Sequence, residues 1–415
     1  MMPVRKKVFF SWLWVALCTL SIFIIIPIAR SVRNFVEKHL SADFFGYSVI
    51  CVVCIAFLTV IYLLWFRLKN RDFPNYLWLA VIACVYIFFT LKLWERPEEA
   101  IHFLEYGLLG LLLFRGLRHH IHDKSIYLTA FLIGGLVGIF DEVLQWMIPS
   151  RIWDMRDIGL NALSCGLCQI AIWKGIRPKL PASRIRPKSI RTLSYFVVTI
   201  IILLALSLSN TPTRVKMYTE FFPFLSFLRK EEPMAQDIYK HRDHEIGIFY
   251  SCLSLEELDR IDTERAEEYG LILEEWSQKK YDAFLNMFPL YAVPFLYEMR
   301  VHIFRRDRRF WLSTKEYTPE NKRNNLFIAY KENLILKKYF GQTLKKSPYK
   351  WPQKRIKRIE SEIDKTSFYK SPVSAATYFP LNNLAMWAIV VGFVVSIFIL
   401  NLWLSHQKKP KPFPR

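Results

Sequence analysis

Long apolar runs separated by short charged stretches dominate the first half of the chain, and one more apolar run lies near its end. A helix needs roughly 20 mostly apolar residues to cross the hydrocarbon core of a bilayer, and fewer where protein shields it. The eight predicted membrane spans are 8–29, 44–66, 76–94, 101–114, 126–148, 158–173, 192–208 and 384–404. The pattern predicts an all-α fold, a polytopic transmembrane helix bundle.

The polar stretch between the last two spans, residues 210–381, is large enough to form a domain. Ser254 and Glu257 have the spacing of a capping box and begin a charged amphipathic helix. Thr318 and Pro319 begin a second helix, which Gly341 can end. Because no alternating strand pattern competes, we expect a mainly α-helical domain.

Composition and charge also indicate an integral membrane protein. Hydrophobic residues make up 53% of the 415 residues and the mean hydropathy is +0.16, more than a soluble protein needs for its core. The formal net charge of +21 then marks cytoplasmic loops and lipid contacts rather than nucleic acid. The basic start of the chain resembles a signal peptide. The apolar run after it is too long and lacks a small-residue cleavage site, so we expect an uncleaved first span.

Basic residues are concentrated in alternate loops. The loops after the second, fourth and sixth predicted spans are rich in Lys and Arg, and so is the tail 405–415. Because Lys and Arg in short loops favour the cytoplasm, both termini are predicted to be cytoplasmic and 210–381 extracytoplasmic. That domain is acidic over 231–299 and basic over 300–370. The two halves either dock on each other or stay solvated, or the basic half lies against anionic headgroups or envelope polymers.

Ionisable residues gather near the outer ends of the fourth, fifth and sixth predicted spans. An ionised carboxylate that faces lipid costs about 2 to 3 kcal/mol, so these groups should face inward or contact water. Spacings of three and four residues put each set on one helix stripe. The residues are His102, Glu105, Tyr106, Asp141, Glu142, Gln145, Arg151, Asp154, Arg156, Asp157 and Asn161. They either form salt bridges that fix the outer loop or line a polar cavity that is open to the outer leaflet and binds a ligand.

These residues resemble the VanZ-like family of bacterial membrane proteins. The resemblance rests on HFLEYGLLGLLL from His102 and on DEVLQWMIPSRIWDMRDIGLNALSCGLC from Asp141, which includes Pro149 in the turn. Gln169 stands where the family pattern has glycine. The resemblance implies a multi-pass protein of the bacterial cytoplasmic membrane, in a family named for resistance to the lipoglycopeptide antibiotic teicoplanin and without a settled biochemical activity. It does not extend to residues 210–415.

The expected layout follows from the spans and the resemblance. Its parts are N-terminal transmembrane helices (1–94), a VanZ-like transmembrane domain (76–174), a basic cytoplasmic loop with the seventh span (175–209), an extracytoplasmic helical domain (210–381), the last transmembrane helix (384–404) and a basic cytoplasmic tail (405–415). Gly134, Gly135 and Gly138 would let a neighbouring helix approach the fifth span closely.

The expected function is binding of an amphipathic ligand, either a membrane lipid headgroup or a lipoglycopeptide such as teicoplanin. Arg151 and Arg156 would contact its anionic groups. The alternative is a membrane-embedded hydrolase or transferase that acts on a lipid-linked cell-wall precursor. In that enzyme His102 or Glu142 would be the general base and Arg151 would stabilise a phosphate. A third hypothesis is an envelope scaffold that acts through its helical domain. Whether any reaction is catalysed stays open.

Other residues carry weaker signals for metal binding. Asp237, His241 and His244 follow the spacing i, i+4, i+7, which could present three metal ligands on one helix face. Glu298 and His302 could complete that site, although surface ion pairs are the commoner explanation for such spacings.

The remaining motifs favour no cofactor chemistry. Six of the seven cysteines lie in apolar segments, where we expect them to be packing residues despite two CxxC spacings. The basic segment RHHIH at 118–122 is expected to be solvated. No nucleotide-binding loop, nucleophile elbow or zinc-protease motif occurs, so no cofactor is expected.

Overall fold

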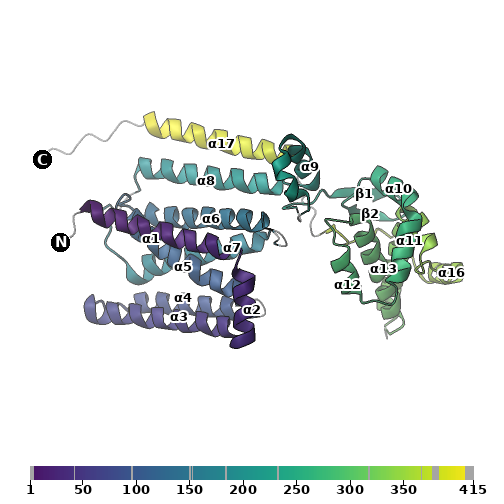
Figure 1. Cartoon of the computed structure of the whole chain (residues 1–415), viewed down its shortest axis with the longest axis horizontal. Helices are drawn as coiled ribbons and strands as arrows, with labels where there is room; N and C mark the ends of the chain where they lie inside the picture. The colour runs from purple at the N-terminus through teal and green to yellow at the C-terminus, as the bar shows by residue number, and fades with distance from the viewer. Residues whose placement is uncertain are drawn as a thin grey trace. The chain divides into compact units, whose positions relative to one another are not determined.

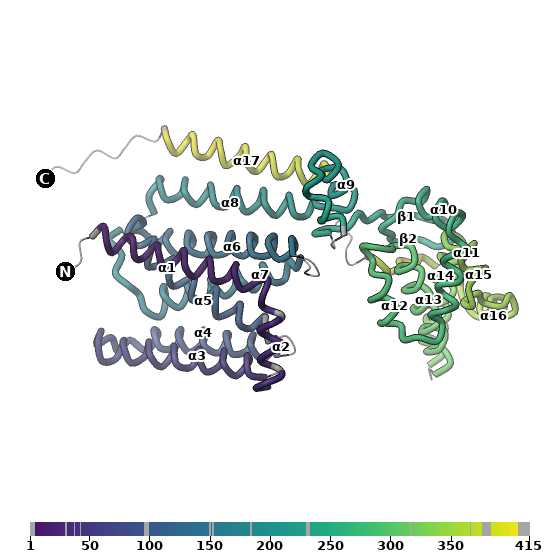
Figure 2. The backbone as a smooth tube through the Cα atoms, viewed as in Figure 1, coloured from purple at the N-terminus to yellow at the C-terminus, as the bar shows by residue number. Residues whose placement is uncertain are grey.

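The computed structural model describes residues 4–41, 43–94, 97–148, 151, 153–182, 185–230, 233–315, 318–365, 367–375 and 383–406. The chain forms two compact units. The first comprises Met1–Leu208 together with Asn383–Arg415, and the second comprises Ser209–Asn382. Figures 1 and 2 show both units coloured along the chain.

The first unit is a bundle of long helices joined by short connections. Successive long helices run in alternate directions, and the short α2 runs across them (Figure 1). The helices are α1 (Val4–Ile25), α2 (Ala29–His39), α3 (Phe44–Tyr62), α4 (Phe73–Lys92), α5 (Pro97–Leu117), α6 (Ser125–Trp146), α7 (Met155–Ile170), α8 (Pro187–Leu208) and α17 (Asn383–His406). Two of them continue as π-helical turns, α3 through Leu63–Arg67 and α7 through Ala171–Ile176.

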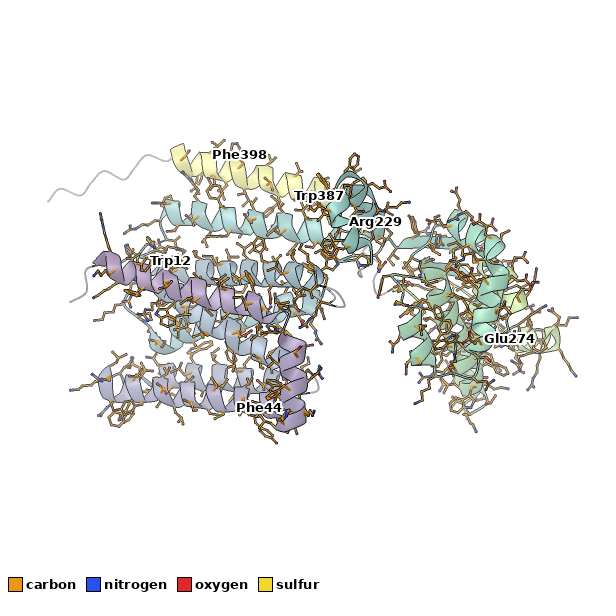
Figure 3. All side chains as sticks on the ribbon, viewed as in Figure 1. Trp12, Phe44, Arg229, Glu274, Trp387 and Phe398 are labelled. Atoms are coloured by element: carbon orange, nitrogen blue, oxygen red, sulfur yellow. The ribbon has the colours of Figure 1, made fainter. Side chains whose placement is uncertain are left out.

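Within the described residues, seven helices are long and apolar enough to cross a membrane. They are Arg5–Ile25, Phe44–Arg67, Phe73–Lys92, Glu99–Leu117, Ser125–Trp146, Pro187–Leu208 and Asn383–Ser405. Large apolar side chains on these helices point away from the bundle, as Phe398 does on α17 (Figure 3). This outward apolar surface confirms the predicted all-α, polytopic membrane fold.

The segment predicted as the sixth span, 158–173, is helical but is not among those seven. It lies within α7 and its π-helical turn, which pack against α5, α6 and α4. Asn161, Ser164 and Gln169 are buried there. Because neighbouring helices rather than lipid cover much of α7, it keeps these polar residues and has a lower hydropathy than the other spans.

Close packing of α6 on α7 depends on small residues. A Cβ atom at Gly134 would lie 2.5 Å from Cys165 Sγ, and one at Gly138 would lie 3.2 Å from Asn161 Cβ. A Cβ at Gly135 would meet nothing within 4 Å. Two of the three glycines predicted to allow close approach therefore contact α7.

The second unit is mainly helical and contains one β-hairpin. The hairpin pairs β1 (Tyr239–Asp243) with β2 (Gly247–Ser251) in antiparallel register. The helices are α9 (Pro212–Phe221), α10 (Leu255–Glu264), α11 (Ala266–Glu275), α12 (Tyr281–Met287), α13 (Pro294–Ser313), α14 (Pro319–Tyr339), α15 (Gly341–Lys346) and α16 (Gln353–Glu362), with a 3₁₀ segment at Pro223–Lys230. The core lies around the paired helices α13 and α14 and includes Phe249, Phe295 and Met299.

Local sequence signals placed some of these ends correctly. Ser254 caps α10 through the reciprocal bonds of the predicted capping box with Glu257. Thr318 is the N-cap of α14, as predicted, but α14 ends at Tyr339 and Gly341 begins the next helix instead. The hairpin was not predicted. Besides its pairing with β1, Ile248 of β2 forms an isolated bridge with the distant residue Lys370.

Candidate functional site

The beginning of α5, the end of α6 and the beginning of α7 meet at one end of the bundle and form what we name the rim cluster. Its members are the residues predicted from the sequence, His102, Glu105, Tyr106, Asp141, Glu142, Gln145, Arg151, Asp154, Arg156, Asp157 and Asn161. Pro149, in the turn between α6 and α7, lies outside the described residues.

Glu142 connects α6 to the start of α7. Its Oε1 accepts a hydrogen bond of 3.0 Å from Gln145 Nε2, and its Oε2 accepts one of 3.1 Å from the backbone nitrogen of Asp154. The Asp154 carboxylate in turn accepts a bond of 2.7 Å from the backbone nitrogen of Arg156 and caps α7. A carboxylate that satisfies helix N-terminal N–H groups holds the helix end in place.

Asp141 lies deeper in the same cluster and is fully buried. Its Oδ2 accepts a hydrogen bond of 3.2 Å from the Tyr106 hydroxyl, which is also buried. Asn161 lies beside them, packed against Gly138. Tyr106, Asp141 and Asn161 therefore form the floor of the rim cluster.

Exposure rises from this floor towards the helix ends. Asp141 and Glu142 are 0% and 1% exposed, whereas the side chains of Asp157 and Arg156 are 27% and 47% exposed. His102 Nδ1 lies 3.2 Å from Glu105 Oε2, and both side chains are about a quarter exposed. The rim cluster is therefore closed around Asp141 and Glu142 and polar at its surface. It is not open over its whole depth.

The two arginines already have partners. Arg156 Nη2 lies 2.5 and 2.6 Å from the two carboxylate oxygens of Glu99, and it also lies within 4 Å of Asp157. Arg151 Nη2 donates to the carbonyl oxygen of Ile26 at 3.3 Å. Arg156 is therefore largely neutralised by acids and is not a free anion-binding group. Glu99 was not among the predicted site residues, although it lies in the acidic stretch before His102.

Several buried polar atoms at the rim cluster have no hydrogen-bond partner among the described residues. They are Asp141 Oδ1, Asp157 Oδ1 and Trp153 Nε1. Buried polar groups are nearly always hydrogen-bonded to protein, water or a ligand. These three atoms are therefore positions at which water or a ligand group can complete the bonding.

The weak metal candidates Asp237, His241 and His244 do not lie together on a helix face. His241 lies in β1 rather than on a helix, with Nε2 3.0 Å from the Leu253 carbonyl oxygen, and His244 lies in the hairpin turn. Asp237 accepts a hydrogen bond of 2.9 Å from Thr213 Oγ1. The i, i+4, i+7 spacing has no common face in an extended hairpin. Across the described part of the chain, no group of three His, Cys, Asp or Glu side chains is arranged to hold a metal.

Glu298 and His302, the pair proposed to complete that site, instead belong to a buried network in the second unit. Glu298 accepts hydrogen bonds from the Cys252 backbone nitrogen and from Ser251 and Ser374, at 2.5 to 2.8 Å. Burial raises the pKa of Glu298 despite these bonds. His302 Nδ1 lies 2.5 Å from Glu332 Oε2. Both carboxylates hold loop segments against α13 and α14.

The fold and the outward apolar helices define an integral, multi-pass membrane protein. Comparison of the chain with family models, curated proteins and solved structures gives no match. The resemblance to the VanZ-like family therefore stays a prediction that rests on the rim residues.

Proposed function

We propose that this chain is a VanZ-like membrane protein of the bacterial envelope that binds the polar part of an amphipathic ligand at the rim cluster. The observation that carries the proposal is the set of buried, incompletely hydrogen-bonded polar atoms at the meeting point of α5, α6 and α7, with Asp141 Oδ1 at the deepest position. Intramembrane ionisable groups commonly mark functional sites.

The charge of the rim cluster favours a ligand with hydrogen-bond donors. Six carboxylates lie in or beside the cluster, from Glu99, Glu105, Asp141, Glu142, Asp154 and Asp157, against two arginines and His102. Arg156 is already paired with Glu99. An amine or hydroxyl group would be complementary, whereas a phosphate or carboxylate would have to displace an existing ion pair. Amine-bearing lipid headgroups and lipoglycopeptides such as teicoplanin both fit this chemistry.

Binding can be measured on the purified full-length chain in nanodiscs of neutral lipid. We expect teicoplanin, and phosphatidylethanolamine in preference to phosphatidylglycerol of the same acyl chains, to bind the native protein. Asp157→Asn and Glu142→Gln should each weaken binding about tenfold or more, the effect of removing one charge-assisted hydrogen bond. Glu264→Gln, on the exposed surface of α10, is the matched control and should bind as the native chain does.

Glu142 also holds the first turn of α7, so the thermal stability of each variant is measured beside its binding. Equal binding by the native chain and by a folded Asp157→Asn variant would contradict the site. In cells, the native chain should protect against teicoplanin and Glu142→Gln should not. Release of product from a labelled lipid-linked precursor would instead support the hydrolase or transferase hypothesis.

A further inference from the structure

The end of the bundle opposite the rim cluster carries a second polar feature, where the beginning of α1 lies beside the end of α5 (Figure 1). A groove of about 950 Å³ runs between these helices. Its basic residues are Lys7, Arg115, Arg118 and His119, and its apolar walls include Trp14 and Leu111. We name it the basic groove.

Helical spacing separates charge from apolar surface along the basic groove. On α1, Trp14 follows Lys7 by two turns, roughly 10 Å further into the bundle at 1.5 Å per residue. On α5, Leu111, Arg115 and Arg118 follow the spacing i, i+4, i+7, so the charges again lie nearer the helix end. The groove is therefore basic at the end of the bundle and apolar deeper down, which is the polarity profile of one bilayer leaflet.

The loop that follows α5 is held against α1. Ser11 Oγ lies 3.1 Å from His119 Nε2, and Trp12 Nε1 donates to His120 Nε2 at 3.1 Å. Figure 3 shows Trp12 on α1. The segment RHHIH was expected to be solvated, but two of its histidines are bonded to α1. The basic wall of the groove thus has a defined position.

The positive charges of the basic groove have no acidic partner within the described residues. Lys7, Arg115 and Arg118 form no ion pair there. The pKa of His119 is lowered by burial and then by the neighbouring His120, Arg115, Arg118 and Lys7. The acid of the same loop, Asp123, accepts hydrogen bonds from Ser189 Oγ and the Arg186 backbone nitrogen. Lys7, Arg115 and Arg118 are exposed and are therefore available to an external anion.

We propose that the basic groove binds an anionic phospholipid, with the phosphate among Lys7, Arg115 and Arg118 and an acyl chain along Trp14 and Leu111. Basic pockets between membrane helices are complementary to anionic headgroups. The apolar wall makes a lipid a better occupant than a free phosphate, because only a lipid covers both parts of the groove. This site is separate from the rim cluster, and neither proposal depends on the other.

The test compares phosphatidylglycerol with phosphatidylcholine of the same acyl chains, titrated into the delipidated full-length chain. The double variant Arg115→Gln, Arg118→Gln should bind phosphatidylglycerol about 30-fold more weakly, the effect of two charges near a lipid surface. Its binding of phosphatidylcholine should stay unchanged. The matched control is Arg67→Gln, Lys69→Gln, which removes two exposed charges from the connection after α3 and should bind phosphatidylglycerol as the native chain does.

A second measurement locates the lipid. Phosphatidylglycerol with a photoreactive acyl chain should label α1 near Trp14 or α5 near Leu111, and Trp14→Ala should reduce that labelling. Equal affinity of the double variant and the control, or labelling only at other helices, would overturn the proposal. So would inorganic phosphate that competes at the same concentration as the lipid, because the groove would then be an anion site without a lipid.

Discussion

Glu332 is the most heavily bonded carboxylate of the second unit. It is fully buried and contacts His302 Nδ1, Arg305 Nε at 2.9 Å, the Tyr369 hydroxyl at 2.5 Å and Ser371 Oγ at 3.0 Å. Burial alone would raise its pKa, but His302, Tyr369 and Arg305 together lower it. Through these bonds Glu332, on α14, fixes both α13 and the distant segment 369–371 to its own helix.

We expect Glu332→Gln to destabilise the second unit by about 3 kcal/mol, because it leaves Arg305 beside a neutral group and breaks a buried network. In hydrogen exchange of the full-length chain, the amides of α13 and α14 should exchange about 100-fold faster. Glu264→Gln, which removes an exposed i, i+4 ion pair with Arg260, should cost less than about 0.5 kcal/mol. Native exchange rates in Glu332→Gln would refute the structural role of this network.

Asp243, at the hairpin turn, makes a pH-dependent contribution to the stability of the second unit. Burial raises its pKa, but bonds from Lys338 Nζ at 2.5 Å, from the Tyr339 hydroxyl at 2.8 Å and from two backbone nitrogens lower it to about 2. A carboxylate with a lowered folded pKa stabilises the fold above its unfolded pKa, near 4, and loses that contribution as the pH falls towards 2.

The native chain should therefore lose roughly 1 to 2 kcal/mol from this group between about pH 4 and pH 2, allowing for the exposed Lys338 partner. The Asp243→Asn variant should not show this loss of unfolding free energy between about pH 4 and pH 2. The measurement is the free energy of unfolding of the second unit as a function of pH in both chains. If the unfolding free energy fell in parallel in the two chains, Asp243 would not be an ionised partner of Lys338.

At the scale of elements, α6 and α7 approach each other through glycine at defined positions. Gly134 faces Cys165, while Gly135, one residue further, faces open space. Gly134→Ala should lower the unfolding free energy by about 1 to 3 kcal/mol because its Cβ overlaps Cys165 Sγ. Gly135→Ala should be neutral or stabilising by up to about 1 kcal/mol.

The thermal midpoint of each variant in detergent tests this prediction, and Gly135→Ala is its matched control. Adding Cys165→Ala to Gly134→Ala should recover part of the loss, because the overlapping sulfur is removed. Similar midpoints for the two glycine variants would contradict the close contact between α6 and α7.

The elements also show where sequence reasoning succeeds and where it fails. Apolar runs predicted the membrane helices well, because lipid requires an apolar surface and a fully bonded backbone. The hairpin at 239–251 was missed, because its short strands, YKHRD and GIFYS, lack the alternation of apolar and polar residues that indicates a strand. Gly247, at a φ of 112°, is packed against the Tyr369 carbonyl, a contact that no local pattern reveals.

The rim cluster was predictable as a set of residues but not as a set of bonds. Helical periodicity brought Asp141, Glu142 and Gln145 to one helix end. The pair of Arg156 with Glu99 spans 57 positions and the bond of the Asp154 backbone to Glu142 spans 12. Partners at such separations depend on how helices pack, which spacing along one helix does not determine.

At the scale of the whole molecule, α7 determines whether the number of membrane passes is even or odd. With α7 and its π-helical turn counted as a pass, α1 begins and α17 ends at the same end of the bundle (Figure 1). The basic connections after α3, α5 and α7 share that end, and the rim cluster lies at the other. This arrangement agrees with an even number of passes, while the side that faces the cytoplasm stays a prediction.

Cysteine labelling tests the sidedness. In a chain whose native cysteines are replaced by alanine, a membrane-impermeant thiol reagent added outside cells should label Met155→Cys at the rim cluster and Lys280→Cys in the second unit. Lys69→Cys should react only after permeabilisation, because basic connections favour the cytoplasm. The reverse pattern would place the rim cluster inside and rule out a ligand from the outer leaflet.

The contact between α8 and α17 has a consequence for how the second unit could have been acquired. Ala205 packs against Met386 and Val390, so the two helices that bracket the unit are direct neighbours. A short flexible turn could join Leu208 to Asn383 without disturbing either helix, much as a hairpin loop joins two antiparallel helices. The second unit is then an insertion in one loop between helices, and a chain in which a short turn replaces it should still insert, fold and keep the rim cluster and the basic groove.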